Sequence, residues 1–185
     1  MLSNDSIRLR PVEHNDLAFL RDLANDPDVR ANVVGWDWPL SLAGQERWFE
    51  SGIDTASTRR LLIESVEDGR PIGLTGLWDI DLQSGNAMTA IKIGGAAENR
   101  GRGYGQQAVR MVMDFAFRDV GLNRLYGSIL EFNAASMALY FDKCGWTHEG
   151  VSRKHVWRNG QYWDVINLGI LREEFLAQEL ARGTR

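Results

Sequence analysis

The chain has few of the residues that form disulfides or metal sites and no segment typical of a membrane anchor. It contains one cysteine among 185 residues, and no apolar run is long enough to span a bilayer. Cys144 alone can form neither an internal disulfide nor a cysteine-rich metal site, which is compatible with a reducing cytoplasm. The segment 1–10 lacks the apolar stretch of a signal peptide. We therefore expect a soluble, cytoplasmic protein without a membrane partner.

An excess of positive charge is also missing. Lys and Arg number 21 against 25 Asp and Glu, which gives a net charge of −4. A mildly acidic chain is a poor general binder of nucleic acid, so we expect no nucleic-acid partner, and an RNA-associated module that uses Arg100 and Arg102 ranks last. The three histidines are dispersed without metal-ligand spacing, so we expect no metal.

The composition is that of an ordinary globular domain. Hydrophobic residues make up 44% and charged residues 25%, which excludes intrinsic disorder and collagen-like structure. The length suits one domain, 1–185, and no linker, low-complexity tract or repeat divides it.

Hydrophobic periodicity and turn signals predict the element order β-α-α-β-β-β-α-β-α-β-β-α. The expected strands are 7–12, 61–66, 72–80, 87–93, 125–132, 151–157 and 162–168, and the expected helices are 14–24, a short helix after Ser41, a long helix ending near 120, 134–143 and 171–182. Segment 25–28 predicts a helix stop, and the rest of 28–58 has no regular pattern. This order predicts a mixed α/β (α+β) domain with a mostly antiparallel central sheet of about seven strands and about four to five flanking helices.

A glycine-rich loop, Arg100-Gly101-Arg102-Gly103-Tyr104-Gly105, lies between a strand and the long helix. Glycines let backbone N–H groups approach a ligand, and a helix N-terminus favours phosphate. A tight turn that merely starts the helix is the alternative. Gln106 excludes the dinucleotide fingerprint, and a Walker lysine is absent.

The loop pattern Arg-x-x-Gly-x-Gly at 100–105 resembles the acyl-CoA loop of GCN5-related N-acetyltransferases (GNATs). Segment 133–140, with Asn133, Ser136 and Tyr140, resembles the family's Asn-x-x-Ala/Ser-x-x-x-Tyr helix, and 143–146 resembles its Lys-x-Gly-Phe end. The opening 7–11 and the closing 158–162 are similar to the branch of RimJ/RimL-type and spermidine acetyltransferases. The resemblance covers nearly the whole chain in order.

This resemblance implies a GNAT-type fold and an acyl-CoA-dependent N-acetyltransferase that moves an acetyl group from acetyl-CoA to a primary amine by direct transfer. Acetyl-CoA is the expected co-substrate. Its expected contacts are the backbone of Ile91, Lys92 and Ile93, the loop residues Arg100, Gly101, Arg102, Gly103, Tyr104 and Gly105, and Asn133. A catalytically silent acyl-CoA sensor and a transferase that uses another acyl-CoA remain alternatives.

The expected general acid is Tyr140, whose phenol would protonate the leaving thiolate. The chain departs from the family at this point, because five residues rather than four separate Tyr140 from Gly145. Counting from Gly145 would place Phe141 in the tyrosine position, whereas counting from Asn133 places Tyr140 there, and we favour Tyr140 because helix register propagates from the N-cap. Asp79 and Glu131, at strand ends, are the candidate general bases.

The resemblance places the acceptor amine against the first helices and the last hairpin. Trp36, Trp38, Trp78 and Trp157 are the expected pocket residues there, and acids outnumber arginines in 26–54. Such a mouth would attract a cationic amine; packing in the core or at a subunit interface is the alternative reading of the tryptophans. The acceptor is a small-molecule or peptide amine, and the sequence leaves open whether it is a protein N-terminus, polyamine, amino sugar or drug. It also leaves open whether the chain forms a homodimer.

Overall fold

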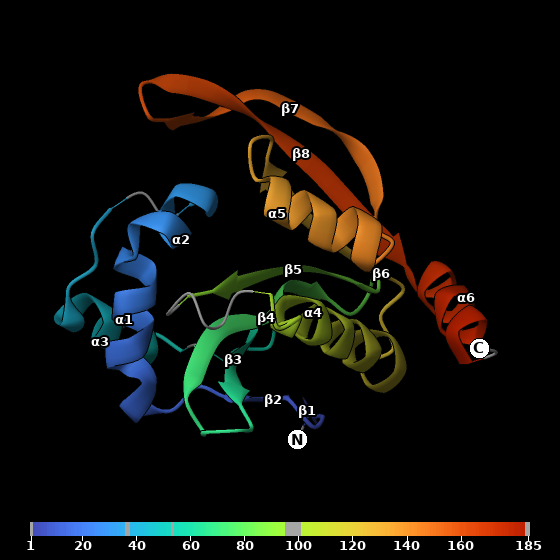
Figure 1. Ribbon diagram of the computed structural model, residues 1–185, viewed down its shortest axis with the longest axis horizontal. Coiled ribbons are helices and arrows are strands. Elements are labelled where there is room, and N and C mark those ends of the chain that lie inside the picture. Colours follow the sequence, from blue (N-terminus) through green and yellow to red (C-terminus); the bar gives the residue numbers. More distant parts are fainter. Residues whose placement is uncertain (1, 36–37, 53, 95–100, 184–185) are drawn as a thin grey trace.

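The computed structural model describes residues 2–35, 38–52, 54–94 and 101–183 (Figure 1). The strands are β1 Leu2–Ser3, β2 Ile7–Pro11, β3 Arg59–Ser65, β4 Pro71–Asp81, β5 Asn86–Ile93, β6 Arg124–Leu130, β7 Thr147–Arg158 and β8 Gln161–Leu171. The helices are a 3-10 turn at His14–Asp16, α1 Leu17–Asn25, α2 Pro27–Asn32, α3 Leu42–Glu50, α4 Tyr104–Asp114, α5 Ala134–Met137 and α6 Arg172–Gly183. Two π-helical segments, Phe115–Asp119 and Ala138–Lys143, continue α4 and α5.

The strands form one eight-stranded sheet in the order β1-β2-β3-β4-β5-β6-β8-β7. Every neighbouring pair is antiparallel except β5 and β6, which α4 connects as a parallel crossover. The predicted mixed, mostly antiparallel fold is therefore confirmed. The additional strand is β1, whose two residues are too short to give an alternation pattern.

Helices cover both faces of the sheet. Helix α4 packs against β2, β4 and β5, and its buried Val109, Val112 and Met113 join the main core. On the other face, α1 packs against β4 and contributes Leu20 and Leu23 to a second cluster. Because successive side chains of a strand point to opposite faces, one strand can serve both clusters.

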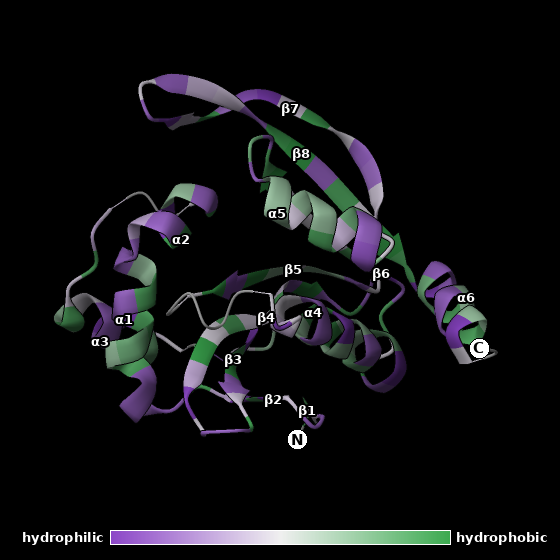
Figure 2. Cartoon of the chain, viewed as in Figure 1, coloured by the Kyte–Doolittle hydropathy of each residue, from purple (hydrophilic) through white to green (hydrophobic). Residues whose placement is uncertain are grey.

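The C-terminal hairpin β7–β8 runs alongside α5 and extends beyond the sheet (Figure 1). Its turn contains Asn159 at φ +52° and Gly160 at φ +80°, the left-handed conformations that an Asn-Gly hairpin requires. Along β8, the residues next to the turn are hydrophilic, and most of those that pair with β6 are hydrophobic (Figure 2). The predicted hairpin is confirmed. No helix in the described part of the chain is long and apolar enough to cross a membrane.

Helix α2 contradicts the sequence prediction, which read 25–28 only as a stop. The Asp26 side chain accepts hydrogen bonds from the backbone N–H groups of Asp28 and Val29, at 2.8 and 3.3 Å, and Pro27 occupies the first helical position. An Asp N-cap followed by proline ends one helix and begins another, because proline lacks only an N–H that the first turn leaves unpaired.

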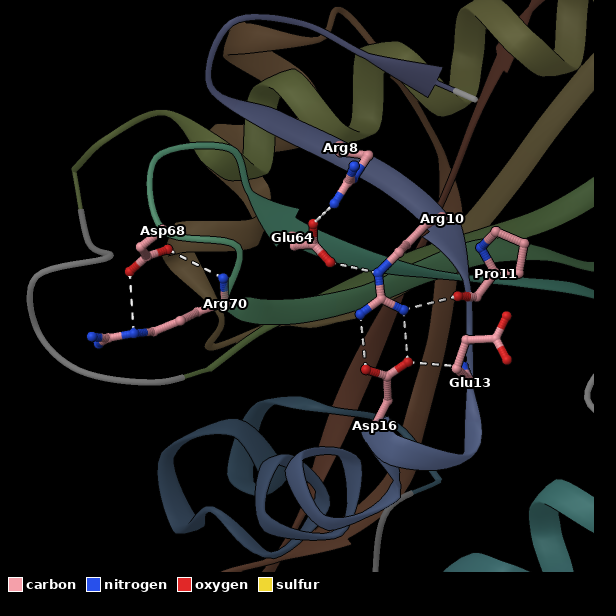
Figure 3. Close-up of polar contacts among 8 residues, drawn as sticks. All are labelled: Arg8, Arg10, Pro11, Glu13, Asp16, Glu64, Asp68 and Arg70. Carbon is pink, nitrogen blue, oxygen red and sulfur yellow. Dashed lines mark hydrogen bonds and ion pairs between the residues drawn. The ribbon is translucent and has the colours of Figure 1, made fainter.

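A cluster of four charged residues ties strands β2 and β3 to the first helical turn (Figure 3). Arg8 and Arg10, on β2, both bind the buried carboxylate of Glu64 on β3, with Arg10 Nε 2.5 Å from Glu64 Oε2. Arg10 also binds Asp16 through two hydrogen bonds of 2.8 and 2.9 Å. Burial alone would raise the pKa of both acids, but the arginine hydrogen bonds outweigh it and lower the pKa of Glu64 and of Asp16 below their ordinary values.

We expect Glu64→Gln to lower the free energy of unfolding at pH 7 by about 2 kcal/mol, because two partly buried guanidinium groups lose their carboxylate. Since folding lowers the pKa of Glu64, its contribution is present above the unfolded pKa of about 4.3 and disappears as the pH falls through the folded pKa. Denaturant titrations between pH 7 and pH 3 should therefore show a smaller acid-side loss of stability in the variant than in the wild type. As a control, Asp114→Asn breaks an exposed pair with Arg118 and should change stability far less; equal losses in the two variants would contradict the prediction.

Candidate active site

The central feature of the site is the separation of β5 and β6. The two strands pair only over Asn86–Met88 and Arg124–Tyr126, although each continues further. Gly127 is the next residue of β6, and a Cβ there would come within 2.9 Å of the carbonyl oxygen of Thr89. The strands then diverge, and backbone groups of β5 that would otherwise pair with β6 face a cavity.

We call this cavity, of about 240 Å³, the gap cavity. Its lining comes from four parts of the chain: Trp78 on β4, Met88–Lys92 on β5, Gly127–Ile129 on β6, and Asn133, Ser136 and Tyr140 on the helix that follows, together with Asn32, Val33, Val34 and Leu168. It combines apolar walls with a few convergent polar groups, which is the usual make-up of a small-molecule site.

A second cavity, the loop-side cavity, extends from the gap toward the start of α4. It has a volume of about 570 Å³ and shares six lining residues with the gap cavity: Asn32, Val33, Ile91, Lys92, Asn133 and Ser136. Its other lining residues are Asp26, Asp28, Val29, Ile93, Gly94, Gly105, Ala135 and Leu139. The expected contacts Ile91–Ile93, Gly105 and Asn133 are thus brought together along one channel.

The N-terminus of α4 ends this channel without a side-chain cap. Helices α2, α3 and α5 are capped by the side chains of Asp26, Ser41 and Asn133, whereas α4 begins after Gly103 in the left-handed conformation, with φ +76°, an N-cap residue without a side chain to bond the first turn. Gly105 faces Leu139, where an added Cβ would lie at 3.4 Å. The first-turn N–H groups and the positive end of an eleven-residue helix fit a phosphate group.

The other predicted loop residues lie around this helix start. Gly101 also has a positive φ, of +77°, and Tyr104 is buried. Arg102 binds Glu67 at 2.7 Å and the hydroxyl of Tyr104 at 2.9 Å, so it bridges the loop to the β3–β4 turn. Arg100 lies outside the described residues.

Tyr140 owes its position to the π-helical segment Ala138–Lys143. One extra residue in a π-turn absorbs the five-residue spacing to Gly145, with the backbone N–H of Cys144 bonded to the carbonyl of Leu139. The register set at Asn133 is therefore kept, and Tyr140 is buried against Trp146 at a ring distance of 4.9 Å. Phe141 turns instead toward His148, with ring centroids 6.3 Å apart.

The phenol of Tyr140 is held in its protonated form. Burial, reinforced by the neighbouring Cys144, raises the pKa of Tyr140 above its ordinary value, and a hydrogen bond with the backbone of Ile91 offsets only part of that effect. A buried phenol with a raised pKa is available to donate a proton to a strong base formed beside it.

Asn133 is an N-cap, as predicted. Its side-chain oxygen accepts a hydrogen bond from the backbone N–H of Ser136 at 3.0 Å, and its amide nitrogen donates to the carbonyl of Asn32 at 3.3 Å. Because Asn32 ends α2, this contact links the two walls of the channel.

The two candidate carboxylate bases lie outside all three cavities that contain Lys92. Asp79 is exposed at a register shift of β4, with φ +50°. The pKa of Tyr126, on β6, is raised first by burial of its phenol and then by the negative charge of Asp79. Glu131 is exposed, and its carboxylate accepts a hydrogen bond from the backbone N–H of Asp164 at 2.8 Å.

A third cavity, of about 320 Å³, lies under α1 and α3, and we call it the helix-side cavity. Its described lining includes Trp38, Trp48, Trp78, Arg60 and Lys92. The guanidinium of Arg60 lies over the ring of Trp48, 5.0 Å from its centroid, and the Lys92 amine lies over Trp78 at 4.5 Å. The face of Trp78, which the sequence analysis assigned to a cationic acceptor, is therefore taken by a cation of the protein itself.

The remaining predicted pocket residues are more peripheral. Trp38 is 87% exposed and Trp157, on the β7–β8 hairpin, is 58% exposed, and both line an open cavity at the hairpin tip. Trp36 lies outside the described residues. The expected acidic mouth does not form on the acceptor side in the described part of 26–54, because Asp26 and Asp28 line the loop-side cavity instead.

Sequence reasoning missed several residues that wall the site. Asn32 and Val33 follow α2, which the sequence analysis did not predict, although Asp26-Pro27 was its signal. Arg60 and the side chain of Lys92 were also missed, and the signal for Lys92 was a charged residue within an otherwise apolar strand. Within the described residues, no group of three His, Cys, Asp or Glu side chains is placed to hold a metal ion.

Comparisons with known proteins agree with this geometry. A family model described as an acetyltransferase (GNAT) domain matches residues 6–147. Spermidine N(1)-acetyltransferase of Escherichia coli K12 is 28% identical over 99% of this chain and 95% of its own, and that of Vibrio cholerae is 27% identical over 94% and 97%. The crystal structure of the V. cholerae spermidine N-acetyltransferase in complex with CoA and spermine superposes with a TM-score of 0.83, covering 94% of this chain and 99% of that one at 27% identity. This chain belongs to the GNAT acetyltransferase family and is an N-acetyltransferase with acetyl-CoA as its co-substrate.

Proposed function

We propose that this enzyme transfers the acetyl group directly from acetyl-CoA to the primary amine of a small molecule in the gap cavity. The observation that carries the proposal is the position of Tyr140, a buried phenol in a cavity between diverging strands that continues into a channel ending at an uncapped helix. The helix N-terminus suits the pyrophosphate of CoA, and the edge of β5 suits the pantetheine amides. Two substrates bound in this order would meet beside Tyr140.

In this mechanism Tyr140 is the general acid. Attack by the amine nitrogen forms the new N–C bond, and collapse of the tetrahedral intermediate breaks the C–S bond and releases a thiolate. The Tyr140 hydroxyl gives its proton to that sulfur and recovers one from the nitrogen of the new amide. Ile91–Ile93 hold the pantetheine arm through their backbone, and Gly101, Gly103, Tyr104 and Gly105 form the phosphate end with Arg100 and Arg102.

Spermidine is the first acceptor to test, because the named relatives from E. coli and V. cholerae act on it. An amine with a single charge is the matched comparison. The cations Arg60 and Lys92 already lie over the tryptophans of the helix-side cavity and would repel the additional charges of a polyamine. A homodimer and the absence of nucleic-acid and membrane partners stay predictions from the sequence.

The purified enzyme should release CoA from acetyl-CoA in a saturable way when a small amine is added. Spermidine, spermine, glucosamine, an aminoglycoside and an N-terminal peptide make up the panel, and each product is checked by mass for one added acetyl group. Silence across the panel, with acetyl-CoA still raising the melting temperature, would contradict this proposal and favour the acyl-CoA sensor. Faster release from propionyl-CoA would instead point to another acyl donor.

Tyr140→Phe should lower kcat about a hundredfold or more, because the thiolate would leave without its proton donor. The affinity for acetyl-CoA, measured by calorimetry, should stay within about twofold, since the ring and its packing on Trp146 are retained. Tyr126→Phe, on β6 and outside the cavities, is the matched control and should leave kcat unchanged. An unaltered kcat in Tyr140→Phe would remove Tyr140 from the mechanism.

Direct transfer also predicts that Cys144 carries no acetyl group. The Cys144 side chain is fully buried, and burial raises the pKa of its thiol to about 11. At pH 8 the folded enzyme should react with Ellman's reagent at least about a hundredfold more slowly than the unfolded chain. Cys144→Ala should retain acetyl transfer, and detection of an acetyl thioester on Cys144 during turnover would argue against direct transfer.

A further inference from the structure

The transfer reaction needs a group that removes a proton from the acceptor, which enters as an ammonium ion at neutral pH. The two carboxylates that the sequence offered line none of the three cavities that contain Lys92: Asp79 is exposed at the β4 register shift, and exposed Glu131 accepts a hydrogen bond from the backbone of Asp164. Among the described residues that line the gap cavity, the titratable side chains are those of Tyr140 and Lys92.

Lys92 occupies the junction of the site. It pairs with Leu74 in the β4–β5 ladder, so its side chain leaves β5 on the face covered by α1 and α3. Among the described residues, it alone lines the gap, loop-side and helix-side cavities together. Its amine lies 4.5 Å from the centroid of the Trp78 ring, and Trp78 lines both the gap and the helix-side cavities. The amine therefore stands where the gap cavity, which holds the acceptor in the proposed function, meets the other two cavities.

The charged and titratable residues that line cavities together with Lys92 come from several elements. Arg60 on β3 lines the helix-side cavity with it, Tyr140 lines the gap cavity, and Asp26, the N-cap of α2, and Asp28 line the loop-side cavity, while the residues of α1 and α3 in the helix-side cavity are uncharged. Burial first, and then repulsion by Arg60, lower the pKa of Lys92 to about 8. Burial raises the pKa of Tyr140 in the same cavity. Two titratable groups whose pKa values are pushed in opposite directions form the acid and the base of many active sites.

We propose that Lys92 is the catalytic base of this enzyme and takes a proton from the acceptor ammonium at the mouth of the gap cavity. The proposal rests on the acetyl transfer proposed above. The acceptor nitrogen loses two protons in all: the first passes to the neutral Lys92 amine and from there to solvent, and the second ends on the thiol of CoA, delivered by Tyr140. Lys92 is neutral again after its proton leaves, so the cycle needs no further reactant.

The first test is the pH profile of kcat/KM with acetyl-CoA and spermidine, or glucosamine where spermidine is not turned over. The wild type should become faster as the pH rises and level off above about pH 8, where Lys92 is neutral. Lys92→Arg keeps the positive charge but cannot give up its proton, so it should lose at least about a hundredfold at pH 8. Lys92→Met should lose as much and should continue to rise with pH, following the acceptor's own titration.

Two controls distinguish the loss of a base from a general effect of removing a positive charge and from a failure to fold. Lys143→Met, on the exposed end of the helix that carries Tyr140, makes the same chemical change and should leave the profile unchanged. Thermal protection by acetyl-CoA should persist in both Lys92 variants. If Lys92→Arg keeps wild-type turnover, Lys92 supplies only charge and the proposal is overturned; if the wild type turns over no amine, the proposed function fails instead.

A second readout does not depend on activity. The chain has only three lysines, Lys92, Lys143 and Lys154, so an enzyme labelled with ¹³C at the lysine ε-carbon gives three signals to follow by NMR. One signal should titrate near pH 8 in the free enzyme and be missing from Lys92→Met. If no lysine signal titrates below about pH 9, Lys92 cannot serve as a base near neutral pH and the proposal is overturned.

Discussion

The site depends on one constraint: β5 and β6 are held apart after three residue pairs, while their outer edges stay fully paired. β4 holds β5 from Gly73 opposite Ile93 onward, and β8 pairs with every residue of β6. Neither strand can move to close the gap without breaking a ladder on its other side. The sheet thus leaves backbone groups of β5 facing the gap cavity instead of β6, and α4, which makes the crossover between the two strands, ends the same channel with its N-terminus.

The helix after β6 determines the position of the Tyr140 side chain in the gap cavity. An insertion of one residue within an α-helix would rotate everything beyond it by about 100°, away from the gap. The π-turn confines the insertion to Ala138–Lys143, so the register from Asn133 to Tyr140 is preserved and the surplus residue is taken up before Gly145. Tyr140 keeps its place while Phe141 packs toward His148.

The order of elements, the hairpin turns and the direction of Tyr140 could be predicted from the sequence because each follows from local rules of periodicity, turn chemistry and capping. The departures arose where tertiary contacts decide. From the sequence, Asp26-Pro27 indicated only the end of a helix. In the structure these residues also begin α2, which lines the loop-side cavity. Asp79 was predicted to face the site from a strand end, but the β4 bulge changes the direction of the chain at that residue. Lys92 has no motif at all, since its role comes from Trp78, Arg60 and Tyr140, which lie far from it in the sequence.

One physical cause, burial of the side chain, gives the two proton-carrying groups opposite properties. A phenol is neutral when protonated and an amine is neutral when deprotonated, so the same low-dielectric surroundings keep the proton on Tyr140 and push it off Lys92. A carboxylate in place of Lys92 would be shifted toward its protonated form and lose its charge, whereas a lysine is made more able to accept a proton. Burial that would disable an acidic residue as a base therefore favours a lysine in that role, which explains why the buried side of this site carries an amine and its carboxylates stay at the exposed strand ends.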